Sequence, residues 1–140
     1  MTLYADVRAA LRTVLLTVAG LPVERAWEAH EYTPIPGTSF LRDTLLPGFA
    51  ERVSLGPFGR VRHHSLYQVD LMVPNRKGTV ADAVADLVVA AFWPGLQMTY
   101  GGQVVTIRTS SRLSGLVSAD GVWRQIPVSI DALTHTLNPA

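Results

Sequence analysis

The stretch 60-RVRHHSLYQVDLMV-73 is the strongest strand signal in the chain and decides the fold. Its apolar residues fall on one face of an extended backbone, namely Tyr67, Val69, Leu71 and Val73. Gln68 and Asp70 fall on the other face, because successive side chains of a strand point to opposite sides. Pro74 then ends the run. The pattern predicts one long strand with a single face against a core.

Two amphipathic helices are predicted on either side of that strand. Over residues 3–18 the apolar residues recur at helical spacing, namely Leu3, Val7, Ala10, Leu11, Val14, Leu15 and Val18. Over residues 78–92 a second stripe has the same period, namely Val80, Val84, Leu87, Val88 and Ala91. Glycine and proline follow each stripe, which is typical of helix ends. Each helix therefore has one apolar face to bury.

Glycine-containing turns predict hairpins in the second half of the chain. Gly101-Gly102 suits a two-residue turn because both positions can adopt positive φ, and Asp120-Gly121 repeats the signal. Pro127 has no N–H group for a sheet hydrogen bond, which predicts that its strand lies at a sheet edge or turns that side outward. The further strands are predicted over residues 23–27, 96–100, 103–109, 113–118 and 122–130.

Residues 30–59 contain four prolines and four glycines, and this spacing excludes a regular helix. The same segment is rich in large apolar residues, namely Phe40, Leu41, Leu45, Leu46, Phe49 and Phe58. A solvated loop would not carry such a load, and a long irregular segment in a small domain is usually functional. We therefore predict an extended arm or hairpin that packs against something.

The order of these elements predicts the fold class. Strands joined in hairpins favour an antiparallel sheet, and two helices with one apolar face each can cover one side of it. We expect one domain over residues 1–140. Its fold is α+β, a mixed and mostly antiparallel sheet with two helices packed on one face and the long Pro/Gly-rich arm or hairpin of residues 30–59.

Composition excludes several classes of protein. The chain has 140 residues, 48% of them hydrophobic, a formal net charge of +1 and no cysteine. It therefore has no disulfides, no thiolate metal site and no cysteine nucleophile. The hydrophobic content is too high for disorder, while no apolar run reaches the roughly 18 residues of a membrane span. The near-neutral net charge argues against a dedicated nucleic-acid-binding surface. The N-terminus does not resemble a signal peptide, so we expect a cytoplasmic origin.

The sequence contains no recognisable catalytic or metal-binding motif, so we expect no enzyme activity, no metal and no cofactor. His63 and His64 are adjacent on a strand and would point to opposite faces, so they cannot hold one ion together. Asp82 and Asp86 share a helix face, but solvated acids near a helix start explain them best. Ser110, Ser111 and Ser114 have no partnered base nearby.

The order of these elements and several short stretches of sequence resemble a known family. The resemblance rests on the helix leading to the strand that ends in Trp27, on Ser39-Phe40-Leu41, and on Ser65-Leu66-Tyr67-Gln68-Val69. It continues through the segment from Gly78 to Phe92 with Pro94-Gly95. It ends with Asp120-Gly121-Val122-Trp123 and Ile126-Pro127-Val128. This order, over nearly the whole chain, resembles the tail terminator proteins of long-tailed bacteriophages and related tail-like particles.

The resemblance implies a structural protein of the virion with no catalytic residues. Proteins of that family form a hexameric ring that caps the head-proximal end of the tail tube, ends its polymerisation and presents a surface for head–tail joining. The implied partners are further copies of the chain, the tail tube protein and the head–tail connector or neck protein. DNA would only pass through the lumen, and no membrane is involved. Assembly would take place in the host cytoplasm.

The size of the domain agrees with a ring around DNA. A compact domain of this length has a diameter of about 37 Å, and six such bodies in a circle leave a hole of similar width.

Assembly would bury the arm against a neighbouring subunit or the tube, because so apolar a patch is rarely left exposed. The expected interface residues are Phe40, Leu41, Leu45, Leu46, Phe49, Phe58, Arg60 and Arg62.

Three other functions stay open at the level of sequence. The chain can be another neck or head-completion protein with a different partner. It can be a small ligand-binding or hydrolytic domain with a pocket near His63, His64 and Asp70. It can also be a nucleic-acid binder that uses Arg60, Arg62, Arg76 and Lys77.

Overall fold

The computed structural model describes residues 3–22, 24–28, 30–56, 59–74, 78–112, 115–118 and 121–137. Its elements follow one another along the chain as α1 (Leu3–Thr17), β1 (Glu24–Ala26), β2 (Phe40–Arg52), β3 (Arg60–Pro74), α2 (Gly78–Ala91), β4 (Gln97–Tyr100), β5 (Gln103–Arg112), β6 (Leu116–Val117) and β7 (Trp123–Leu137). Both predicted helices and every predicted strand are present. The sequence underestimated the lengths of β5 and β7, and it overestimated that of β6.

In the described part of the chain, the strands form a single seven-stranded sheet in the order β1-β2-β3-β7-β5-β4, with β6 paired to β7. Only β1 runs parallel to its neighbour β2, and the other pairs are antiparallel. The long strand β3 lies between β2 and β7 and pairs with β7 over its full length. The prediction of a mixed, mostly antiparallel sheet is confirmed.

Of the two alternatives predicted from Pro127, an edge strand or an N–H side turned outward, the edge strand is wrong. Strand β7 is internal, with β3 on one side and β5 and β6 on the other. On the side of β5 and β6, Arg112 of β5 lies opposite Val128, and Leu116 of β6 lies opposite Gln125. Pro127 therefore lies where pairing with β5 ends, before pairing with β6 begins. Pro127 lies opposite Asp70 of β3, but no residue of β5 or β6 in the described part of the chain is paired with it, so a proline interrupts no ladder on that side.

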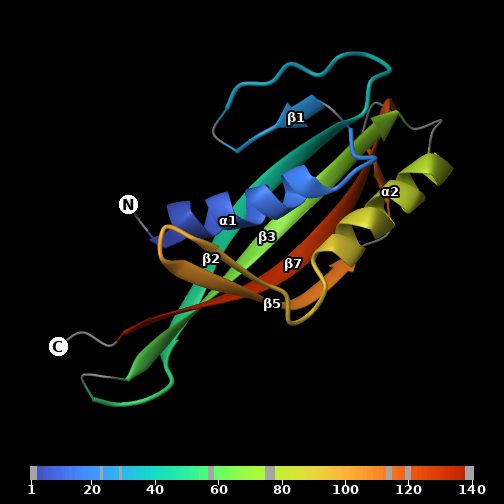
Figure 1. The fold of residues 1–140 in the computed structure, drawn as a ribbon. Coiled ribbons are helices and arrows are strands. Elements are labelled where there is room, and N and C mark those ends of the chain that lie inside the picture. Colours follow the sequence, from blue (N-terminus) through green and yellow to red (C-terminus); the bar gives the residue numbers. More distant parts are fainter. Residues whose placement is uncertain are drawn as a thin grey trace.

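The two helices cover one face of the sheet, as Figure 1 shows. The core lies between them and the sheet, and it includes Leu11, Tyr67, Val69, Phe92 and Ile130. On β3 the odd-numbered side chains from Ser65 to Val73 face this core and are buried. The even-numbered side chains face the other side of the sheet, which we call the outer face. No helix in the described residues is long and apolar enough to cross a membrane.

The expectation of an irregular arm over residues 30–59 needs correction. Residues 40–52 form β2, which pairs with β3 as a long antiparallel hairpin whose far end extends beyond α1 (Figure 1). The register shifts between Pro47 and Ala50, and this bulge lets a proline lie within the strand. Gly48 is required there, because a Cβ would lie 2.9 Å from the His64 carbonyl oxygen. The alternative of a hairpin is therefore the correct one.

Candidate functional site

The far end of the β2–β3 hairpin exposes four large apolar side chains. Along β2 the side chains are mostly buried as far as Leu45 and mostly exposed beyond it. The exposed fractions are 46% for Leu46, 63% for Phe49, 41% for Val53 and 83% for Leu55. We call these four residues the hairpin patch. Nothing in the described part of the chain covers them, so the hairpin offers an apolar surface to a partner.

Phe49 is held in place by His64 on the facing strand. The two rings stack with their centroids 4.1 Å apart and their planes 25° from parallel. His64 Nε2 lies 3.1 Å from Glu51 Oε1, and the Arg62 guanidinium donates to the same oxygen at 3.1 Å. The hydrogen bond to His64, with help from Arg62, lowers the pKa of Glu51. The carboxylate therefore stays charged and joins both strands at the base of the patch.

The outer face beside this cluster is basic. Arg62 Nε lies 3.5 Å from His135 Nε2, and burial together with the charges of Arg62 and Arg60 lowers the pKa of His135. His135 is therefore neutral at pH 7. Arg52 and Arg60 are exposed and have no carboxylate partner among the described residues. The far end of the hairpin thus carries three arginines and one acid, Glu51. Only Arg62 pairs with Glu51, and Arg52, opposite Val61 in the register, lies on the helix side.

A groove of about 310 Å³ runs behind Phe49 on the outer face, lined by residues of β2, β3, β5 and β7. Its floor includes Leu66, and the ion pair of Arg108 with Asp131 at 3.2 Å closes one side. Its walls are more apolar than polar. The groove continues the hairpin patch toward the middle of the sheet.

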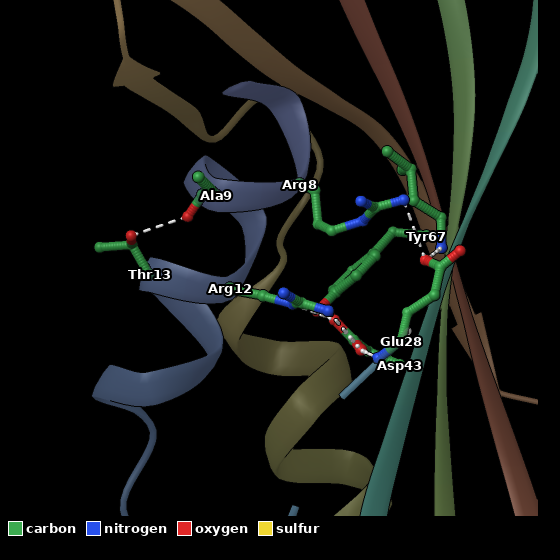
Figure 2. Close-up of polar contacts among 8 residues, drawn as sticks. Arg8, Ala9, Arg12, Thr13, Glu28, Asp43 and Tyr67 are labelled. Atoms are coloured by element: carbon green, nitrogen blue, oxygen red, sulfur yellow. Dashed lines mark hydrogen bonds and ion pairs between the residues drawn. The ribbon is translucent and has the colours of Figure 1, made fainter. Parts of the chain in front are cut away.

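The near end of the hairpin is fixed by a buried carboxylate, Asp43. Arg12 donates to it from Nε at 2.6 Å and from Nη2 at 3.1 Å, as Figure 2 shows. The Tyr67 hydroxyl donates to Oδ2 at 2.7 Å, and the Glu28 backbone N–H donates to Oδ1 at 2.9 Å. A single carboxylate therefore joins α1, β2, β3 and the end of β1.

The hydrogen bonds of this network shift the pKa values of Asp43, Arg12 and Tyr67. Burial alone would raise the pKa of Asp43, but the hydrogen bonds from Arg12, Glu28 and Tyr67 outweigh it, and the pKa lies below its ordinary value. The pKa of Arg12 is raised by the hydrogen bond to Asp43, and that of Tyr67 is raised by burial and by the Asp43 charge. Asp43 and Arg12 are therefore charged, and Tyr67 keeps its proton as a donor.

A second ion pair supports the same corner of the fold. Glu28 accepts the Leu45 backbone N–H at 2.9 Å and pairs with Arg8 at 3.2 Å (Figure 2). The Arg12 guanidinium also lies 4.9 Å from the centre of the Trp27 ring. These contacts hold the end of β1 against β2.

The structure divides the predicted interface residues into two groups. Leu41 and Leu45 are buried in the core, and Phe40 is buried on the outer face against Tyr32 and Trp123. The chain itself already covers these three side chains. The structure brings the others to the far end of the hairpin, where Leu46 and Phe49 are exposed, Arg60 is exposed and Arg62 binds Glu51. Phe58 lies outside the described residues.

The residues of the predicted small-molecule pocket do not come together. His63 lies on the helix side and contacts Thr136 and Tyr4, whereas His64 lies on the outer face. Asp70 is buried on the outer face and pairs with Arg42 at 3.2 Å. No group of three potential metal ligands occurs among the described residues. Of the predicted basic set, Arg76 and Lys77 lie outside the described residues.

Other acidic residues have structural partners. Asp82 and Asp86 share Arg112 of β5, at 3.1 and 3.7 Å. Neither the Asp43 network nor the role of Glu28 was predicted from the sequence. One signal was present in the sequence, since Asp43 alternates with Leu41 and Leu45 and so lies on the apolar face of its strand. An acid in that position requires a buried partner.

Comparisons with known proteins agree with this architecture. A protein-family model described as "Phage tail terminator protein" matches residues 6–131. One solved structure, which carries only a sequence identifier as its name, superposes with a TM-score of 0.71 at 22% identity and covers 100% of both chains. Another, a chain of the "Virion of native gene transfer agent (GTA) particle", superposes with a TM-score of 0.64 at 15% identity. This second match covers 96% of the present chain and 98% of the other. The comparison with curated proteins gave no significant match.

Proposed function

The chain belongs to the phage tail terminator protein family, whose members are structural proteins of the virion, and we propose that it acts as a homohexameric ring on a tail tube. The ring caps the head-proximal end of the tube and ends its polymerisation. Its opposite surface receives the head–tail connector or neck protein. DNA passes through the lumen without being retained.

The observation that carries this proposal is the hairpin patch. Leu46, Phe49, Val53 and Leu55 are exposed together on an element that extends beyond the helices. Single exposed apolar residues are common, but a group of four on one projecting hairpin marks an interaction surface. A neighbouring subunit or the tube protein covers this patch in the assembled tail.

Electrostatics support a lumen that lets DNA pass. Affinity for duplex DNA grows with the number of phosphates that lysine and arginine neutralise. The formal net charge here is only +1, and most described arginines are engaged with carboxylates within the chain. A ring of such subunits is weakly charged, so its hold on passing DNA is weak.

The test is assembly on the tail tube. The purified chain is measured by size-exclusion chromatography with light scattering, alone and after mixing with its cognate tail tube protein. Negative-stain images of the mixture should show six-fold rings at one end of each tube, and tube length should stop increasing. A ring that closes only on the tube also agrees with the proposal.

Pull-down separates the proposal from the neck-protein alternative. The tagged chain should retain the tail tube protein and, once bound to a tube, the connector protein. A chain that stays monomeric with tube protein present, or that binds the connector and not the tube, would contradict the proposal.

A further inference from the structure

A closed ring of identical subunits needs two different surfaces on each subunit, one for each neighbour. The hairpin patch is one such surface. A second apolar surface lies on the helix side, in a pocket of about 230 Å³ between the segment that follows α1, helix α2 and strand β3. Its lining includes Leu21, Pro22, Leu71, Val73, Ala81 and Val84. We call it the helix-side pocket.

This pocket is large enough to receive a side chain of the hairpin patch. Cavities of about 150 Å³ accept a molecule as large as benzene, so 230 Å³ accommodates a leucine or phenylalanine side chain. The lining side chains are almost all apolar. Leu87 of α2 extends the surface beside Gly20 and is 43% exposed, although it is a large aliphatic residue.

The charges around the two surfaces are complementary. The far end of the hairpin carries Arg52, Arg60 and Arg62 but a single carboxylate, Glu51, which pairs with Arg62 alone, so this end of the subunit is basic. The surface of α2 carries an excess of negative charge, because the exposed acids Asp82 and Asp86 share a single basic partner, Arg112. Leu87 lies on the flank of α2 toward Gly20, just after α1, and the two acids lie on the flank toward Arg112 of β5. A hairpin laid across α2 therefore places apolar side chains at the pocket and arginines near the acids.

The two surfaces lie at different ends of the subunit. In Figure 1 the far end of the hairpin is at the lower left, and α2 is at the right beside the other end of β3. A contact between two hairpin patches would bring like-charged arginines together and would close a two-fold dimer. A contact between the hairpin patch and the helix-side pocket is head-to-tail and can continue around a ring.

We propose that the hairpin patch of one subunit docks in the helix-side pocket of the next subunit, with Leu55 close to Leu87. This inference rests on the proposed ring and identifies the two surfaces that join its subunits. The partner is a second copy of this chain.

Engineered cysteines test the contact cleanly, because the natural chain contains none. Leu55→Cys and Leu87→Cys are made singly and together, since both side chains are exposed and the changes should leave the fold intact. Rings assembled on tail tubes are treated with a mild oxidant and with a short bismaleimide, and products are separated on a denaturing gel. Disulfides form only where Cα atoms approach within about 7 Å.

The double variant should give a ladder of linked subunits that ends at six. Equal mixtures of the two single variants should give linked pairs, and neither single variant should link to itself. The matched control joins Leu55→Cys with Val104→Cys, another exposed position, and should stay unlinked.

Rings that form normally but show no linkage above the control would overturn the docking arrangement and leave the ring intact. Linkage of Leu55→Cys to itself would also overturn it, in favour of a two-fold contact. Absence of rings with unmodified protein would instead contradict the proposed function.

Discussion

The Arg12 guanidinium binds the Asp43 carboxylate through two hydrogen bonds, at 2.6 and 3.1 Å, and so joins the first helix to the strand that carries the exposed hairpin patch. The pair lies at the near end of the hairpin, whereas Phe49 and Leu55 lie toward its far end. Stability and assembly therefore depend on different residues of the same hairpin. Substitutions at the two ends should separate the two properties.

Asp43→Asn should lower the free energy of unfolding by about 3 kcal/mol at pH 7, because loss of one partner leaves the other charge of a largely buried pair without compensation. Urea denaturation at equilibrium measures the change. The matched control is Asp86→Asn, which removes an exposed acid and should alter stability by less than about 0.5 kcal/mol. Equal effects of the two substitutions would show that the network does not stabilise the fold.

Stability should also fall in acid through Asp43. Its pKa in the folded protein lies below the unfolded value of about 3.9, so the carboxylate stabilises the fold above about pH 4. That contribution is lost as the pH falls through the folded pKa. The difference in unfolding free energy between the natural chain and Asp43→Asn should therefore shrink from pH 7 to pH 3. A constant difference over this range would contradict the assignment.

The Gly101-Gly102 turn should respond unequally to alanine. Both glycines have positive φ, at 59° and 82°, so each substitution strains the backbone by about 1 kcal/mol. A Cβ at Gly101 would also lie 2.8 Å from Cγ of the buried Asp6, whereas at Gly102 it meets nothing within 4 Å. Gly101→Ala should thus cost clearly more than Gly102→Ala in thermal denaturation. Equal costs would mean that Asp6 moves aside freely.

Charges placed on the hairpin patch should prevent assembly without unfolding the subunit. Phe49→Asp and Leu55→Asp each replace an exposed side chain, so Tm should stay within a few degrees of the natural value. Burying the new carboxylate at an interface is costly, and rings on tail tubes should be lost. Electron microscopy of tube ends gives the measurement. Ile35→Asp, at another exposed apolar position, should assemble normally.

The periodic patterns of the sequence were enough to predict the elements and their class. The spacing of Val7, Leu11 and Leu15 predicted α1, and the alternation of Tyr67, Val69 and Leu71 predicted β3. Gly101-Gly102 predicted the turn between β4 and β5, and both glycines have positive φ in the structure. Such signals are local, because each depends on residues within a few positions of one another.

The candidate site depended on contacts between distant residues. The sequence placed Phe40, Leu41, Leu45, Leu46 and Phe49 together as one apolar surface. The structure divides them, because β2 pairs with β1 and lies under α1 near its start, so Leu41 and Leu45 are buried and Phe49 is not. The edge-strand alternative for Pro127 was wrong for a similar reason, since no local pattern reveals which strands flank β7.

The sequence by itself determined two amphipathic helices, a mostly antiparallel sheet, the absence of cysteine and a resemblance to tail terminators. Tertiary structure decided which apolar residues are core and which are surface, and it brought Arg12, Glu28, Asp43 and Tyr67 to one point. Burial and charge pairing are properties of the packed chain. They depend on the order of the strands in the sheet and on how far along each strand a helix covers it. Short-range sequence patterns carry no information about either.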